Sequence, residues 1–194
     1  MIKLLNHAQD LLDKTRIADG LAPLLMRIYL FLPLWEAGVN KLRGFPDTVS
    51  WFGDSLGLPF PTLMAVMAIM AELGGSMALL AGVATRWATV PLMVTMLVAI
   101  FSVHLGNGWL AIAASDSYWF GMMEGATALT QFKEWAQDYP QYQELVRHGP
   151  LVLLNNGIEF AATYFIMLLS LFFTGAGTLS LDALIVRRFR NRAA

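Results

Sequence analysis

The sequence lacks cysteine and carries little charge, and both shortages narrow what the chain can be. Without cysteine there is no disulfide, no thiolate metal site and no thiol relay. Charged residues make up only 14% of the 194 positions, whereas soluble domains carry about 25%. The formal net charge is −1, so no nucleic-acid partner is expected. His104 is the one histidine near a candidate membrane helix, so no haem is expected.

Hydrophobic residues are correspondingly abundant. They make up 57% of the chain, and the mean hydropathy is +0.55. Four apolar segments come near the roughly 20 residues that span a bilayer. They cover residues 21–41, 62–83, 87–104 and 151–174. The pattern predicts an all-α integral membrane four-helix bundle over residues 21–185, in contact with the lipid bilayer.

The segments outside the four spans predict the topology. Residues 1–20 have the pattern of an amphipathic helix, which we expect to lie on the cytoplasmic membrane surface rather than form a removed leader. Residues 186–194 form a basic tail, and the positive-inside rule then places both termini in the cytoplasm. Residues 105–150 form a long external connection whose aromatic residues recur at helical spacing, which predicts interfacial helices.

Two charged residues within the spans are candidates for chemistry, Arg27 and Glu72. Glu72 shares a helical face with small residues such as Gly75 and Ser76, so we expect it to face protein rather than lipid. If Arg27 lies beside it, the carboxylate can stay ionised. A purely structural role, in which Glu72 holds the bundle by a hydrogen bond, explains its position equally well.

A second polar set lies toward the outer end of the predicted spans. It consists of Glu36, His104, Asn155 and Glu159. Because they lie at a similar depth, these side chains are predicted to line one pocket open to the outside. Nitrogen and oxygen donors of this kind can bind a divalent metal or relay protons. The alternative is a polar mouth that only solvates the helix ends.

Four motifs carry a resemblance to a known family. They are RIYLFLPLWEAGVNKLRGF (27–45), AELGGSMALLAGVATRWA (71–88), HLGNGW (104–109) and NNGIEFAATYFIMLLSLFFTGAGTLSLDALI (155–185). Together they resemble the DoxX family of small four-helix bacterial membrane proteins. The positions that match the family pattern are Arg27, Lys41, Glu72, Arg86, Glu159 and Asp182. The family's Gly-Lys at the end of the first helix is Asn40-Lys41 here.

The resemblance implies a function only in outline. The family takes its name from a subunit of a quinone-linked sulfur oxidoreductase, which implies quinone as a cofactor and Arg27, Lys41, Glu72 and Arg86 as candidates to bind it. The long aromatic connection and NNGIEFAATYF look most like members of the HvfX type. That type implies a role in maturing a copper-responsive, ribosomally made peptide, with copper as a second possible ligand. Its partners would be a soluble peptide-modifying enzyme or the peptide itself.

Two other functions stay open beside the redox-linked one. A small transporter of metal or peptide would use buried Glu72 and Glu159 as ion sites, and it would need a homodimer because four helices enclose little space. A non-catalytic anchor would recruit a soluble partner through the arginines of residues 187–192. Those arginines also suit anionic lipid.

Overall fold

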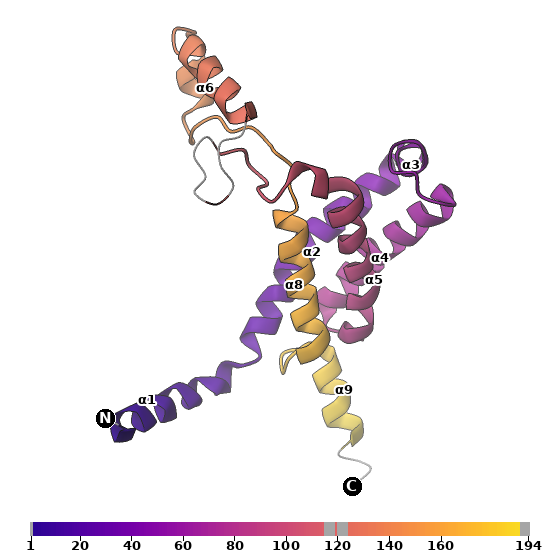
Figure 1. The fold of residues 1–194 in the computed structure, drawn as a ribbon. Helices are drawn as coiled ribbons and strands as arrows, with labels where there is room; N and C mark the ends of the chain where they lie inside the picture. Colours follow the sequence, from indigo (N-terminus) through magenta and orange to yellow (C-terminus); the bar gives the residue numbers. More distant parts are fainter. Residues whose placement is uncertain (1, 115–118, 120–123, 191–194) are drawn as a thin grey trace. The chain divides into compact units, whose positions relative to one another are not determined.

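The computed structural model of the chain describes residues 2–114, 119 and 124–190 and is built of helices (Figure 1). No strand occurs among the described residues, apart from one isolated antiparallel bridge. The chain divides into two compact units, and each is described by itself. The helical unit comprises Met1–Met96 and Tyr164–Ala194, and the loop unit comprises Leu97–Thr163.

Within the described residues, three helices are long and apolar enough to cross a membrane. They are α2 (Leu21–Arg43), α4 (Pro61–Ala81) and the helix Thr85–Asn107, which begins as α5 (Thr85–Val98). The last one continues as a π-helical stretch, η3 (Ala99–His104), and a short 3-10 turn, η4 (Leu105–Asn107). Helices therefore occupy the first three predicted spans, with ends that differ by a few residues, and their membrane boundaries stay predictions.

The fourth helix, α8, is shorter than predicted. It runs from Glu159 to Thr174, about 24 Å of helix, so the prediction of a helix from residue 151 is wrong. Residues 153–159 instead pair with residues 108–113 through backbone hydrogen bonds, including the bridge between Ile112 and Leu154. Asn156 adopts a left-handed conformation with φ of 59°, which no helix continues through.

The core of the helical unit draws on all four of these helices. Its buried members are Leu30 and Leu34 of α2, Leu79 of α4, Leu92 and Met96 of α5, and Leu168 and Leu171 of α8. These residues recur every three or four positions along their helices, so each helix turns one stripe toward the others. The predicted four-helix bundle is confirmed.

Shorter helices complete the described chain. They are α1 (Ile2–Lys14), η1 (Thr15–Ala18), α3 (Phe45–Ser50), η2 (Trp51–Ser55), α6 (Glu124–Ala136), α7 (Tyr142–Leu145) and α9 (Leu181–Arg190). The helix predicted within residues 1–20 and the helical stretch predicted within residues 105–150 are both present. Their placement on the membrane surface stays a prediction.

Candidate functional site

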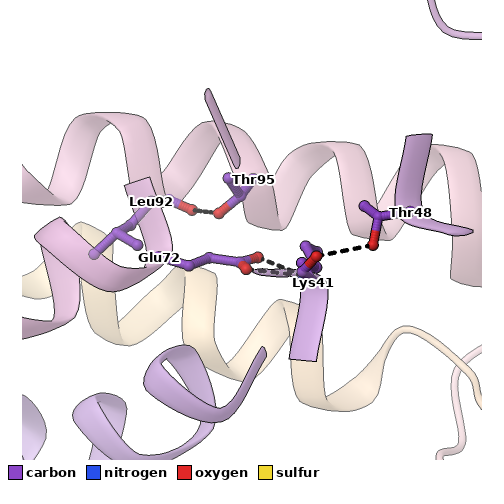
Figure 2. A network of polar contacts seen from close by, with 5 residues as sticks. All are labelled: Lys41, Thr48, Glu72, Leu92 and Thr95. Atoms are coloured by element: carbon purple, nitrogen blue, oxygen red, sulfur yellow. Dashed lines mark hydrogen bonds and ion pairs between the residues drawn. The ribbon is translucent and has the colours of Figure 1, made fainter. Parts of the chain in front are cut away.

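An ion pair inside the helical unit joins α2 to α4. Lys41 Nζ donates to both carboxylate oxygens of Glu72 at 2.8 Å (Figure 2). The side chain of Glu72 is only 4% exposed, whereas that of Lys41 is 22% exposed. Glu72 is therefore enclosed by protein, as its small-residue face predicts. Lys41 is the member of the pair that a ligand can reach.

Two glycines let the helices approach on either side of Glu72. A Cβ at Gly38 of α2 would lie 2.7 Å from Leu73 Cδ2 and 3.2 Å from Glu72 Cβ. A Cβ at Gly75 of α4 would lie 2.9 Å from Leu92 Cδ1 of α5. A larger residue at either position would push the helices apart. The small residues around Glu72 thus set the spacing that brings its carboxylate within reach of Lys41.

Two threonines lie near the pair, and both bond to backbone carbonyl oxygens (Figure 2). Thr48 of α3 donates to Lys41 O at 3.3 Å and to Gly44 O at 3.0 Å, so it fastens α3 to the end of α2 beside the ammonium group. Thr95 donates to Leu92 O at 2.7 Å within its own helix. The sequence carries no signal for either position, because threonines commonly bond their own backbone in this way.

The geometry of the pair leaves part of its bonding capacity free. An ammonium group has three N–H donors, and Glu72 accepts two of them from Lys41. The third donor can meet a carbonyl or anionic oxygen of a bound molecule. A carboxylate held against an ammonium group can also exchange a proton with it. The ion pair and a hydrogen bond from the ammonium group to a bound oxygen are both stronger in a poorly solvated interior than in water.

A second cation of α2, Arg27, is fully enclosed and bonds only to the backbone. Nη1 donates to Leu79 O at 3.2 Å and Leu80 O at 3.4 Å, and Nη2 donates to Leu179 O at 2.5 Å. The residue is 1% exposed. Leu79 and Leu80 are in the last turn of α4, where carbonyl oxygens have no partner within the helix. Arg27 therefore completes the end of α4 and ties it to the segment before α9.

Asp182 binds the same turn from α9. Its carboxylate accepts hydrogen bonds from Ala84 N at 2.8 Å and Thr85 N at 3.1 Å, and its own N–H donates to Gly82 O at 2.9 Å. Gly82 ends α4 with φ of 67°, and a Cβ there would collide with Arg27 Nη1. The family-like block from residue 71 to 88 and the closing block from residue 155 to 185 are thus tied together by Arg27 and Asp182.

Of the four residues predicted to hold a cofactor, the structure brings two into contact, Lys41 and Glu72. The condition that Arg27 lies beside Glu72 is not met, because Arg27 lies about 21 Å from Lys41 along α2 and is bonded elsewhere. Arg86 donates to Phe173 O. Arg27, Leu34 and Gly38 are all buried, on one side of α2.

The predicted metal ligands are engaged with the backbone or lie in different units. In the loop unit, His104 Nδ1 lies 2.8 Å from Asn156 O, Asn155 donates to two backbone carbonyl oxygens at 2.7 Å, and Glu159 accepts from a backbone N–H at 2.9 Å. Glu36 belongs to the helical unit. Within the described residues, no group of three or more His, Asp or Glu could hold a metal ion. The four-residue ligand set stays a prediction.

Comparison with known proteins supplies the family. The DoxX family model matches residues 22–105, a range that contains α2, α4 and the Lys41–Glu72 pair. The chain is also similar to a protein of Bacillus subtilis (strain 168) named "Putative oxidoreductase CatD". The two are 32% identical over 93 residues, which is 48% of this chain and 67% of that protein. No solved structure matches the chain.

Fold and similarity agree. The described residues include three helices able to cross a membrane and a shorter apolar fourth, and residues of all four form one core in the helical unit. The resemblance to the DoxX family is confirmed, while the finer likeness to the HvfX type stays a prediction. The chain is a multi-pass membrane protein and belongs to the DoxX family.

Proposed function

We propose that this chain is a quinone-associated, redox-linked component of the bacterial inner membrane, with Lys41 and Glu72 as its working groups. The observation that carries the proposal is the pair itself, in which a buried carboxylate holds an ammonium group that is still 22% exposed. Charged groups inside a membrane domain are costly and usually mark a site. Similarity to a protein named as an oxidoreductase agrees with this role.

The surroundings of the pair fit a quinone. When bound, a quinone would accept and donate electrons together with protons. Its carbonyl oxygens accept hydrogen bonds, and the Lys41 ammonium group has one N–H beyond those directed at Glu72. Glu72 holds Lys41 in position and can exchange a proton with it.

Arg27 and Arg86 enter the proposal in a different role. Their hydrogen bonds go to backbone carbonyl oxygens at helix ends. We therefore assign them to positioning the helices rather than to contact with the cofactor. Glu72 and Lys41 are then the candidates for direct contact.

The finer setting follows from the resemblance to the HvfX type. In that setting the chain serves the maturation or handling of a copper-responsive modified peptide, beside a soluble peptide-modifying enzyme. Both termini then lie in the cytoplasm, as the distribution of lysine and arginine predicts. Copper in this setting would be cargo of the peptide system.

The test is quinone binding by the full chain purified in mild detergent. Bound quinone is extracted and quantified, bound metals are assayed, and a short-chain quinone is then titrated into the stripped protein. We expect Glu72→Gln and Lys41→Met each to weaken binding roughly tenfold, because Lys41→Met removes the ammonium donor and Glu72→Gln removes the charge that holds it in position. Glu134→Gln makes the same chemical change on exposed α6 and should leave binding unchanged.

The other functions appear as distinct outcomes. Copper without quinone, retained in Glu72→Gln, would contradict the redox role and favour metal handling. Proton-coupled uptake of metal or peptide into proteoliposomes, lost in Glu72→Gln, would favour a transporter. Absence of any ligand, with Glu72→Gln folded and unchanged, would overturn the site and favour a membrane anchor.

A further inference from the structure

Helix α9 begins at a fixed place in the helical unit. Asp182, in its first turn, accepts from Ala84 N and Thr85 N, and Arg27 donates to Leu179 O just before it. These contacts hold the start of α9 against the turn between α4 and α5. Both of those helices belong to membrane-spanning segments, so the turn between them lies at a membrane surface. The start of α9 is therefore at that surface too.

From this fixed start, α9 presents an apolar face that no part of the described chain covers. Leu184, Leu181, Ile185 and Phe189 fall within an arc of about 140° at 100° per residue, and Arg188 lies within the same arc, where its long side chain can reach the head groups. All four are exposed, between 44% and 63% of their area. An exposed stripe this wide on a ten-residue helix is typical of helices that lie in the interface of a bilayer.

The charges of α9 favour one kind of partner. Arg187 and Arg188 are exposed, residues 183–190 contain no acidic residue, and neither arginine forms an ion pair within the described residues. Helix α1 is also amphipathic, but there Lys3 and Lys14 are balanced by two aspartates. A basic helix with an exposed apolar stripe, fixed at a membrane surface, complements anionic lipid head groups.

We propose that α9 docks on the adjacent leaflet, with Leu181, Leu184, Ile185 and Phe189 in the head-group boundary and Arg187 and Arg188 on anionic lipid. The docking is independent of the quinone proposal, because it uses none of the residues of the Lys41–Glu72 pair. It gives the tail a lipid partner in place of a soluble protein. Loss of anionic lipid should release α9 while leaving the four-helix core intact.

The chain's lack of cysteine makes the test direct. A single Ile185→Cys carries an environment-sensitive fluorophore in the full chain, reconstituted in nanodiscs of phosphatidylcholine alone or mixed with phosphatidylglycerol. Quenching by nitroxide lipid reports contact with the bilayer, and quenching by iodide reports contact with water. We expect lipid quenching to dominate with phosphatidylglycerol. Adding Arg187→Gln and Arg188→Gln should weaken docking roughly 30-fold, about fivefold for each arginine.

A matched control and three outcomes decide the proposal. Lys14→Gln with Arg16→Gln removes the same charge from the N-terminal region and should leave the quenching unchanged. Iodide quenching that is equal in both lipid mixtures would overturn the proposal, because α9 would then lie in water. Lipid quenching that does not depend on phosphatidylglycerol would overturn the role of the arginines. Protection from both quenchers would show that protein covers α9 and would also overturn it.

Discussion

The two cations of α2 occupy contrasting environments on the same helix. Arg27 is 1% exposed and directs its donors to three backbone carbonyl oxygens, whereas Lys41 is partly exposed and faces one buried carboxylate. The guanidinium group matches several fixed acceptors at once, and the ammonium group is a compact charge with a movable stem. Arg27 is thus committed to holding helix ends together, and Lys41 keeps a donor that a bound molecule can use.

The contrast shows how a buried charge in a membrane protein can serve structure or chemistry. A cation that is enclosed by protein and bonded to backbone carbonyl oxygens cannot change partner without opening the fold. A cation paired with a carboxylate can exchange a proton or accept a third group while the fold stays closed. Substitutions at the two ends of α2 should therefore separate stability from ligand binding.

The largest effect on stability is expected for Arg27→Leu. The substitution removes the charged donor that bonds to Leu79 O, Leu80 O and Leu179 O. A hydrogen bond to a charged group contributes about 1.5–3 kcal/mol, so the free energy of unfolding should fall by roughly 3 kcal/mol. Thermal unfolding in mild detergent, followed by tryptophan fluorescence, measures it. Arg16→Leu at an exposed site is the control, and equal midpoints for the two variants would contradict the structural role.

Gly82→Ala should lower the free energy of unfolding somewhat less than Arg27→Leu does, and in the same region, since Gly82 contacts Arg27. The residue has φ of 67°, and a Cβ would meet Arg27 Nη1 and lie 2.7 Å from Ser180 Cβ. The left-handed conformation alone costs about 1–2 kcal/mol for a residue with a side chain, so we expect roughly 2 kcal/mol in total. Gly74→Ala is the matched control, since a Cβ there meets nothing within 4 Å. If both variants unfold at the same temperature, the packing around Gly82 is not tight.

At the other end of α2, single and double substitutions should behave differently. Lys41→Met leaves Glu72 as an unpaired buried carboxylate, and we expect a loss of roughly 2 kcal/mol, below the range for fully buried pairs. Adding Glu72→Met should restore stability to within about 1 kcal/mol of the parent, because apolar residues can replace a buried ion pair. Quinone binding should stay weakened. A double variant no more stable than Lys41→Met would assign the pair a structural role.

The smallest effect is expected for Thr48→Val. The change preserves shape and removes the hydroxyl that donates to Lys41 O and Gly44 O. One lost hydrogen bond of this kind costs about 1 kcal/mol, and the affinity for a short-chain quinone should fall by less than tenfold. Thr174→Val removes a hydroxyl bonded to its own exposed helix and is the control. A larger effect on stability than that of Arg27→Leu would reverse the contrast between the two ends.

The loop unit marks a limit of prediction from the sequence. A continuous apolar run predicts a helix from residue 151, yet α8 begins at Glu159. Residues before it bond to residues 108–111, for instance Asn155 N to Ala111 O at 2.8 Å. A Cβ at Gly157 would collide with Leu110 O, so the glycine is required for this approach. The Asn-Asn-Gly run indicates a turn locally, but no local pattern indicates that this turn pairs with a segment more than 40 positions earlier.

The sequence by itself determined the helices, their buried faces and the burial of Glu72. Apolar stretches near membrane length leave the backbone only a helix, and small residues around a carboxylate place it against protein. Only the tertiary structure decided that Glu72 binds Lys41 and that Arg27 binds carbonyl oxygens of α4 and of the segment before α9. The pairing depends on how far two antiparallel helices are shifted along each other. That shift is set by contacts such as Gly38 against Leu73, which local periodicity does not encode.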